Sequence, residues 1–224
     1  MTTDSPSIAD RIIDSGFSLF RFSQLGEDSV VLHYFGTKRN GFYVDIGAHH
    51  PFRYSNTAML HEVLGWRGIN VDPDERAISA FRQYRPNDIN LTCAIAGEEK
   101  QVDFYEFNDG AVNTIDTARA LVAQQTFGQV GTRSVVAMTL KSVFDNCLPK
   151  GQSIDYLNID TEGLDIEVLA SNDWDLYRPT LVSVEDHGFD ISKPVESPCY
   201  VLLKEKGYQL FSHCVVTSFY VRKD

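Results

Sequence analysis

The chain has 224 residues, which fits one α/β domain or at most two small ones, and its 43% hydrophobic content allows one sizeable core. Its 31 acidic residues outnumber its 20 basic residues, so the net charge is −11. Because nucleic acids and anionic membrane surfaces attract clustered basic side chains, this balance disfavours both as partners and favours small neutral substrates.

The predicted organisation is an N-terminal extension followed by one domain. Residues 1–40 precede the first strong strand and are expected to form a helical extension or cap, because the apolar side chains of residues 30–35 recur at helical spacing and Gly36 follows them. Residues 41–224 form the predicted domain, and no internal repeat interrupts them.

From Gly41 onward, short apolar runs alternate with amphipathic stretches. This alternation predicts parallel strands joined by right-handed crossovers, and therefore a doubly wound α/β sheet. The predicted strands are 42–46, 68–71, 89–95, 102–107, 156–159 and 181–184. The predicted helices are 55–64, 74–84, 118–125 and 164–170. A closing antiparallel pair is expected at 208–211 and 215–221, separated by 212–214.

Ligands of doubly wound sheets bind beyond the carboxyl ends of the strands, so the residues there are the first candidates for a site. The first predicted strand ends at Asp45, Ile46 and Gly47. A dinucleotide fingerprint needs three glycines in this turn, and the Asp45 carboxylate would repel a diphosphate. An aspartate beside a turn with one glycine instead suits a positively charged ligand, such as the amino and sulfonium groups of S-adenosylmethionine. The alternative is that Asp45 only caps the turn.

The second predicted strand ends near Asp72, which precedes Pro73 and a predicted helix. An acidic residue at this place accepts hydrogen bonds from the ribose diol in nucleoside-binding sheets. Asp72 can instead serve only as a cap for the helix after Pro73. Together, Asp45 and Asp72 favour a nucleoside that carries a positive group and no diphosphate.

Four acidic residues and a histidine follow two later parallel strands. Asp160 and Glu162 come after one strand, and Glu185, Asp186 and His187 come at the end of the next. Neighbouring strands bring these side chains to one edge, where their mutual repulsion needs an offset. A divalent cation bound by Asp160, Glu185 and Asp186 is one solution. A shared proton, or substrate hydroxyls bonded to the carboxylates, is another, and some of the carboxylates can be plain helix caps.

Three histidines are candidate general bases, because imidazole titrates near neutral pH. His49 and His50 lie in the turn after the first strand, where a histidine is more often a hydrogen-bonded structural group. His187 ranks above them because it directly follows the carboxylates.

An ordered series of motifs runs from about residue 22 to the C-terminus. The motifs are SQLGED (23–28), FYVDIGA (42–48), SNT (55–57), GWRGINVDP (65–73), IDTEG (159–163), EVL (167–169), NDW (172–174) and RP (178–179). This series resembles the FkbM family of S-adenosylmethionine-dependent methyltransferases. The resemblance implies a class I methyltransferase domain, whose Rossmann-like sheet has seven strands and an antiparallel last pair.

The resemblance also implies roles for the residues of a cofactor site. Asp45 and Gly47 would border the methionine part of S-adenosylmethionine, and Asp72 would bind its ribose. The segment Cys93-Ala94-Ile95 would lie near the adenine, and Gln24 would close over the cofactor from the extension.

Some related sugar O-methyltransferases bind magnesium through one acidic residue after the fourth strand and an acidic pair after the fifth. Asp160, Glu185 and Asp186 match that pattern in type and order. The chain departs from the common family pattern at Thr161 and at His49, and the second departure affects the expected choice of substrate.

The activity implied by the resemblance is transfer of a methyl group to a hydroxyl of a sugar, a glycoconjugate or a secondary metabolite. Asp160, Glu162 and His187 are the predicted catalytic residues: Glu162 or His187 would take the hydroxyl proton, and Asp160 would help to orient the acceptor, directly or through magnesium. An NAD-dependent sugar-modifying enzyme is the rival activity, which the missing glycines disfavour. A non-catalytic cofactor-binding module is a further alternative.

The expected partner is a small molecule or a glycan, with no nucleic acid and no membrane insertion. The oligomeric state stays open, a homodimer included. No apolar run approaches the length of a membrane span, and the first ten residues lack the features of a secretory signal. The four cysteines form no CxxC pair. We therefore expect a cytoplasmic protein.

Overall fold

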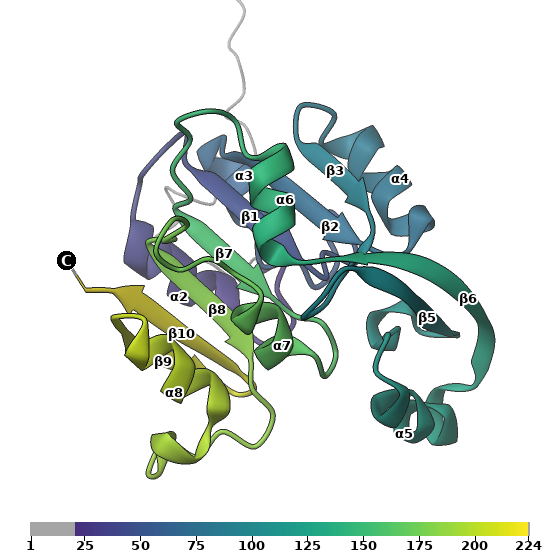
Figure 1. Cartoon of the computed structure of the whole chain (residues 1–224). Coiled ribbons are helices and arrows are strands. Elements are labelled where there is room, and N and C mark those ends of the chain that lie inside the picture. Colours follow the sequence, from purple (N-terminus) through teal and green to yellow (C-terminus); the bar gives the residue numbers. More distant parts are fainter. Residues whose placement is uncertain (1–20, 224) are drawn as a thin grey trace, which may run out of the picture.

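The computed structural model describes residues 21–223, which contain two sheets (Figure 1). The larger sheet has seven strands in the order β3-β2-β1-β7-β8-β10-β9, parallel except for β10, which runs antiparallel to both of its neighbours. This is the predicted class I methyltransferase arrangement. The strands are β1 (Phe42–Ile46), β2 (Arg67–Asp72), β3 (Ile89–Thr92), β7 (Tyr156–Ile159), β8 (Leu181–Glu185), β9 (Tyr208–Cys214) and β10 (Thr217–Arg222).

Helices cover both faces of the larger sheet (Figure 1). One face packs against α6 (Leu140–Cys147), α7 (Asp165–Ala170) and α8 (Pro198–Glu205). The other face packs against α2 (Glu27–Phe35), α3 (Ala58–Leu64) and α4 (Glu75–Tyr84). Within residues 21–223, no helix is both long and apolar enough to cross a membrane.

The alternation of side chains along β1 shows how the sequence builds these two layers. Val44 and Ile46 point into the core beneath α6, α7 and α8, whereas Tyr43 packs in the core beneath α2 and α3. Because successive strand residues face opposite sides, Asp45 lies on the same side as Tyr43. The candidate aspartate is therefore held within the α3 side of the sheet.

The predicted strand 89–95 is wrong as a single element. The chain leaves the larger sheet after β3, and Ala94–Ile95 form β4 of a second, three-stranded sheet. This sheet also contains β5 (Lys100–Phe107) and β6 (Gln129–Met138), and α5 (Thr117–Phe127) lies between them in the chain. The run 89–95 contains no glycine or proline that would indicate a change of sheet, so its sequence reads as one strand.

Two further differences concern the C-terminal part. Residues 212–214 were expected to form a turn, but they continue β9, and the chain turns after them at Val215, which has a φ of 57°. The elements β6, α6 and α8 have no counterpart among the predicted ones. β6 alternates exposed and buried side chains over only part of its length, which gives a weak signal.

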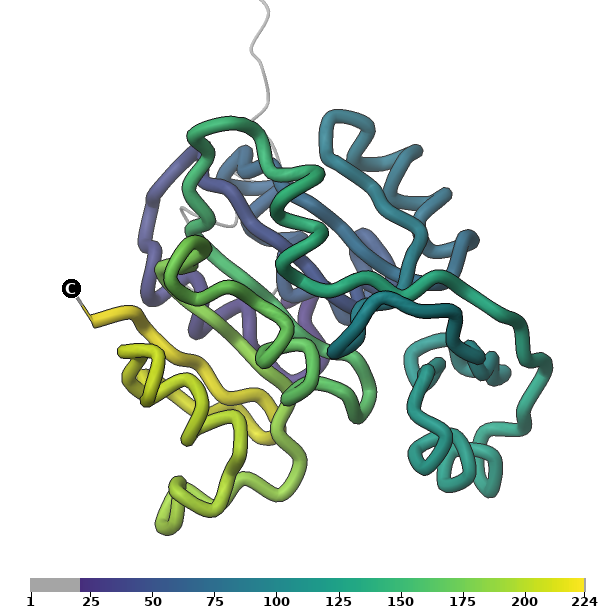
Figure 2. Tube along the Cα trace, viewed as in Figure 1, coloured from purple at the N-terminus to yellow at the C-terminus, as the bar shows by residue number. Residues whose placement is uncertain are grey.

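Residues 94–138 form a compact insert, which projects to one side of the larger sheet (Figure 2). The insert has its own small clusters of buried side chains around Phe104 and Phe107. The short 3₁₀ helix η1 (Gly110–Val112) connects β5 to α5 within it. As for the predicted extension, its described part contains α2, and Val31 of α2 is buried against the sheet. Residues 1–20 lie outside the described part of the chain.

A fully buried arginine connects α4 with β1 and with the loop that follows β1. Arg85, at the C-terminal end of α4, is 0% exposed, and its guanidinium donates to the Tyr43 hydroxyl at 3.0 Å and to Thr57 Oγ1 at 2.9 Å. It also donates to the Pro51 carbonyl and to Ser55 Oγ. A buried cation with these partners fixes the loop between β1 and α3 onto the sheet.

Replacing Arg85 by Met should destabilise the fold by about 3–5 kcal/mol, because it leaves buried hydroxyls and a carbonyl without their donor and the nearby Asp45 carboxyl without its cation. Arg82→Met is the matched control: Arg82 lies on the same helix and pairs with Glu75 at the surface, so its loss should cost less than about 1 kcal/mol. Urea denaturation of the two variants measures both values, and equal effects would contradict the role given to Arg85.

Candidate functional site

A cavity of about 290 Å³ opens beyond the carboxyl ends of β1, β2 and β7. Its floor is the turn after β1, and its roof is a segment of the insert, residues 109–115. All six residues predicted to bind the cofactor line it: Gln24, Asp45, Gly47, Asp72, Cys93 and Ala94. Of the predicted catalytic residues, Asp160 and Glu162 line the cavity, whereas His187 does not. The structure therefore brings most of the predicted site together, and the roles of its residues stay predictions.

The turn at Gly47 leaves no room for a side chain. Gly47 has a φ of 77°, and a Cβ atom placed on it would lie 1.7 Å from the carbonyl oxygen of Asp160. The turn is fixed by hydrogen bonds from the Gly47 and Ala48 amides to the Val71 carbonyl, at 2.9 and 3.1 Å. The backbones of the β1 and β7 ends therefore approach each other directly under the cavity.

Asp45 is buried at the centre of a polar network. One carboxylate oxygen accepts from Thr57 Oγ1 at 2.7 Å and the other from Asn158 Nδ2 at 2.9 Å. Burial raises the pKa of Asp45, and these two hydrogen bonds oppose that rise. Since each carboxylate oxygen can accept more than one hydrogen bond, Asp45 can also bond a ligand in the cavity that it lines.

Asp72 at the end of β2 accepts two backbone hydrogen bonds, from His49 at 2.9 Å and from Asp74 at 2.7 Å. These bonds tie the turn after β1 to the turn after β2. Burial raises the pKa of Asp72 to about 6, against the effect of the two bonds. The N-cap of α4 is Asp74, whose side chain accepts a hydrogen bond from the Arg76 amide. The alternative prediction, that Asp72 caps this helix, is therefore wrong.

The cavity has an apolar end beyond β2 and β4. Cys93, which directly follows β3, lines this end together with Ala94, Phe104, Val112 and Ile115 of the insert. Burial raises the pKa of the Cys93 thiol to about 11, so this cysteine is neutral at physiological pH. This apolar part of the cavity, with Asp72 at the neighbouring end of β2, suits a flat base joined to a ribose.

The opposite end of the cavity is polar. It is lined by Gln24, Glu27, Asn56 and Asn158, with Asp160 and Glu162 beside them. Gln24 is exposed at the start of the described chain, and Glu27 is buried in the first turn of α2. Hydrogen-bonding groups in this number suit the charged end of a cofactor and the hydroxyls of a second substrate.

Asp160 and Glu162 differ in their surroundings. The pKa of Asp160 lies well above its ordinary value because the carboxyl is buried and faces other carboxylates, Glu185 first among them. Glu162 instead accepts two hydrogen bonds from the Arg119 guanidinium, from Nε at 3.1 Å and from Nη2 at 2.7 Å. Glu162 also adopts a φ of 53°, in the left-handed region that a glutamate rarely occupies.

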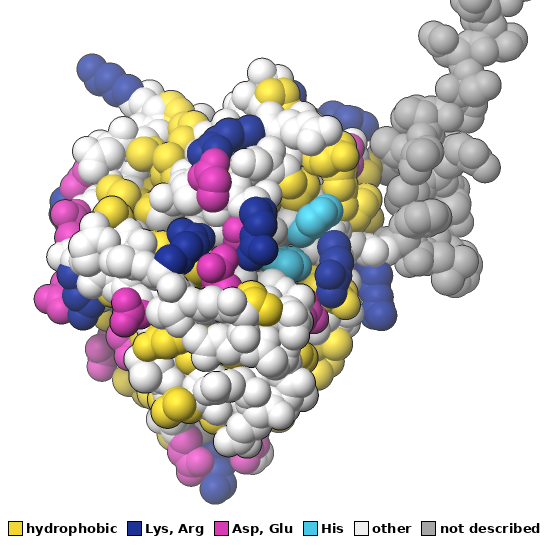
Figure 3. All heavy atoms as spheres, turned by 90° about the vertical axis from the view of Figure 1, so that its right-hand side faces the viewer, with side chains coloured by type: hydrophobic (Ala, Val, Ile, Leu, Met, Phe, Trp, Pro, Cys, Tyr) yellow, Lys and Arg dark blue, Asp and Glu magenta, His cyan; other side chains and the backbone are white. Residues whose placement is uncertain are grey.

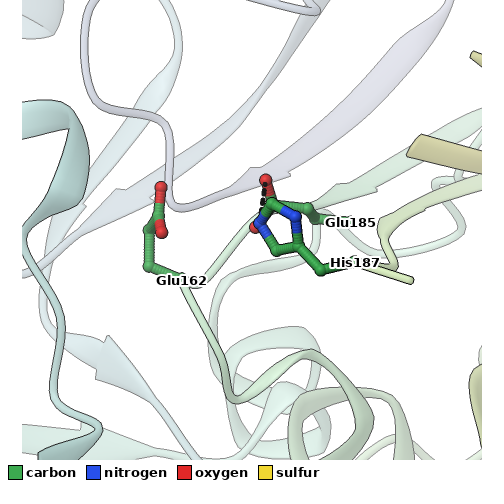
Figure 4. Close-up of side chains that lie close together, drawn as sticks. All are labelled: Glu162, Glu185 and His187. Carbon is green, nitrogen blue, oxygen red and sulfur yellow. Dashed lines mark ion pairs between the residues drawn. The ribbon is translucent and has the colours of Figure 1, made fainter. Parts of the chain in front are cut away.

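Three ligating side chains meet beyond the ends of β7 and β8 (Figure 4). Ligand atoms of Glu162, Glu185 and His187 all lie within 4.8 Å of one another, and His187 Nε2 is 3.1 Å from Glu185 Oε1. Burial and the nearby Glu162 raise the pKa of Glu185 to about 8. Asp186 points elsewhere, because its carboxylate accepts from Ser197 Oγ at 2.5 Å next to α8.

The residues do not fit the predicted magnesium site. Asp160, Glu185 and Asp186 are not one of the ligand groups that residues 21–223 bring together. The group that does form contains Glu162, which already binds the Arg119 guanidinium, and the same guanidinium lies 3.2 Å from His187 Nε2. A cation thus already offsets part of the negative charge that the metal was expected to balance.

Several residues of the site escaped the sequence analysis. Arg119 comes from a helix whose sequence gives only a weak amphipathic signal, and it meets Glu162 only because the insert folds back. Thr57 contacts Asp45, although its motif gave no reason to expect it. His49 and Tyr54 have φ values of 52° and 58°, and the rings of the two stack with their planes 18° apart.

The surface beside the site bears charges of both signs. On the face in Figure 3, basic side chains are interspersed with acidic ones and form no continuous basic surface. Arg76, for example, pairs with Asp74 and Glu106. Such a surface gives little attraction to a polyanion.

The sequence profile of the methyltransferase FkbM domain matches residues 45–210. The chain belongs to the FkbM methyltransferase family. The match begins at Asp45 and extends into β9, so it contains the cavity floor, the insert and the carboxylates after β7 and β8.

Comparisons with whole proteins add little to this membership. No curated protein matches the chain significantly. Two similar solved structures are a precorrin-6y C5,15-methyltransferase from Geobacter metallireducens GS-15 and a proposed rRNA methylase from Clostridium thermocellum. The first is 11% identical, with a TM-score of 0.45, over 88% of this chain and 87% of its own. The second is 12% identical, with a TM-score of 0.46, over 92% of this chain and 99% of its own.

Gly47→Ala should disrupt the cavity floor, because the new methyl group would overlap the Asp160 carbonyl and the left-handed backbone would be strained. We expect a loss of at least about 2 kcal/mol in stability and no ligand binding at the site. Gly97→Ala is the control, since its new Cβ would meet only Glu167 Cβ at 3.8 Å. Thermal unfolding of both variants checks the expectation, which fails if Gly47→Ala melts like the parent.

Proposed function

We propose that the protein is an S-adenosylmethionine-dependent O-methyltransferase that acts on a hydroxyl of a sugar, a glycoconjugate or a secondary metabolite. The observation that carries this proposal is the cavity of an FkbM-family chain with an apolar end, a polar end and a single-glycine turn between them. A diphosphate does not fit this floor, because the buried Asp45 and Asp72 carboxylates both border it.

The residues present fit the cofactor. Asp72 would bind the ribose diol, and the apolar part of the cavity beside Cys93 and Ala94 would take the adenine. Asp45, beneath the Gly47 turn, supplies the negative charge that favours an amino or sulfonium group above it. When bound, the cofactor supplies a methyl group on a sulfonium, whose sulfur is a good leaving group.

Asp160 is the residue that the structure favours for the acceptor proton. It lines the cavity beside the Gly47 turn, and the residues described give it no ion pair, in contrast to Glu162. A carboxylate with a raised pKa is a stronger base, so Asp160 can hold a hydroxyl in place and accept its proton. His187 lies outside the cavity, next to Glu185, where it can influence the carboxylates but does not line the space for the reactants.

A neutral, hydroxyl-rich acceptor suits the polar end. The carboxylates of Glu27, Asp160 and Glu162 surround that end, and they would repel an anionic acceptor. The same carboxylates accept hydrogen bonds from several hydroxyls at once. We therefore infer a small molecule or a glycan as substrate rather than a nucleic acid.

Calorimetry with S-adenosylhomocysteine tests the cofactor assignment, because the ligand should bind and should compete with S-adenosylmethionine. Asp72→Asn should weaken binding by about 1–3 kcal/mol, since a charged acceptor of the ribose hydroxyls is lost. Asp74→Asn is the matched control, because Asn also caps helices and Asp74 does not line the main cavity. Absence of binding by the parent, or NADH binding at the same site, would end the proposal.

The same titration has a defined pH dependence. The pKa of Asp72 is about 6, and the ribose diol bonds its ionised form, so protonation competes with the cofactor. Affinity of the parent should therefore rise as the pH increases from about 5 to about 7. In Asp72→Asn this rise should shrink, and an unchanged pH profile would show that another group causes it.

Asp160→Asn should lower kcat at least about 100-fold and leave the affinity for S-adenosylhomocysteine within about threefold of the parent. Because Asp160 must be ionised to take the proton, activity of the parent should rise with pH through the raised pKa of this carboxyl. Methylation of the best acceptor from a panel of methyl glycosides measures the effect. His187→Asn is the comparison, and a larger loss in His187→Asn than in Asp160→Asn would transfer the role to the histidine.

A further inference from the structure

One continuous segment of the insert roofs the cavity. Every residue from Asp109 to Ile115 lines it, including the 3₁₀ helix η1. The segment is bonded to its own subdomain, because Thr114 and Tyr105 exchange backbone hydrogen bonds of 2.9 and 3.2 Å and Asn113 Oδ1 accepts from the Phe107 amide at 2.8 Å. The roof is therefore built to move with the insert rather than with the larger sheet.

The insert is attached to the larger sheet at its base. β4 and β6 lead into and out of it, and Arg133 of β6 donates to the Pro73 carbonyl at 2.5 Å. The buried clusters of the insert are separate from the main core, so apolar packing does not hold its far edge against the sheet. What holds that edge is polar.

Glu162 makes the principal contacts across the far edge. Its backbone carbonyl accepts from Thr114 Oγ1 at 2.9 Å, and its carboxylate receives the Arg119 guanidinium. The Arg119–Glu162 pair is partly shielded, with 35% and 17% of the two side chains exposed. On the other rim, Arg53 and Asp109 form a longer and more exposed pair of 3.6 Å. Both rims of the roof are thus closed by ion pairs, and Glu162 receives the stronger one.

We propose that residues 109–115 are a lid through which S-adenosylmethionine is exchanged, and that Glu162 is the catch that holds the lid through Thr114 and Arg119. This proposal rests on the proposed function for the identity of the ligand. A cofactor lying between the Gly47 turn and this segment would be covered by the backbone of the roof, and separation of the far edge from the β7 end would widen its path of entry and release. The left-handed backbone of Glu162 places its carboxylate and its carbonyl toward the insert together.

Release kinetics of Arg119→Met test the catch. Radiolabelled S-adenosylmethionine bound to the full chain is chased with unlabelled S-adenosylhomocysteine, and we expect release about three- to tenfold faster than from the parent. Association should accelerate as well, so the Kd should change less than either rate. Lys100→Met is the matched control, because it removes one positive charge from the same insert but breaks only a pair with Glu98.

A reversible crosslink tests the lid without removing the catch. A Cβ placed on Gly163 would lie 3.6 Å from Asp116 Cβ, which is within the range for a disulfide. Gly163 has a φ of 115°, so a cysteine there is strained, and the comparison is made between the oxidised and reduced forms of one double variant, Asp116→Cys with Gly163→Cys. Oxidation should slow release at least about tenfold, and reduction should restore it.

The outcomes separate the two proposals. If the parent binds no S-adenosylmethionine, the proposed function fails. Amide hydrogen exchange still tests the lid in that case, because residues 109–115 should exchange faster in Arg119→Met than in Lys100→Met. If the parent binds the cofactor but release is unchanged in Arg119→Met and in the oxidised double variant, the lid is wrong and the cofactor enters by another route.

Discussion

The site depends on one buried charge arrangement, in which the Arg85 guanidinium and the Asp45 carboxylate are joined through the hydroxyl of Thr57. An isolated aspartate beneath the floor of a cavity would protonate and lose its charge. Arg85 lies close enough to favour the ionised form, and Thr57 and Asn158 each donate to it. Because Asn158 lies on β7 and Thr57 precedes α3, the bonds that favour the ionised form also hold the end of β1 against β7 and against the start of α3.

The floor and the roof of the cavity are held in place by different interactions. The floor is the edge of a parallel sheet, where buried apolar strands and a buried polar network leave little freedom. The roof is a small subdomain with its own core, joined to the floor mainly by ion pairs and single hydrogen bonds. A rigid floor suits the recognition of a fixed ligand shape, and a separately packed roof suits repeated opening.

The sequence predicted the larger sheet well, because its central strands β1, β2, β7 and β8 are buried on both faces, and glycines such as Gly41 and Gly65 precede two of them. It predicted the cavity residues that lie on this sheet for the same reason: strand ends are local features. It failed where the outcome depends on tertiary contact. The split of 89–95 between two sheets, the Arg119–Glu162 pair and the divergence of Asp186 toward Ser197 all depend on where distant segments pack. The sequence identified Gly47 as the glycine of the turn after the first strand, but not the reason why a side chain does not fit there, which is the carbonyl of Asp160.

The chain enters the insert through β4 and leaves it through β6, and these two strands pair side by side, with Ala94 opposite Ala137 and Ile95 opposite Met138. A segment whose two ends emerge at neighbouring points can be lengthened, shortened or replaced without shifting the strands of the parent sheet. Evolution can therefore remodel the covering of this pocket as a module. The strand ends that form the cavity floor would then stay unchanged while the covering varies.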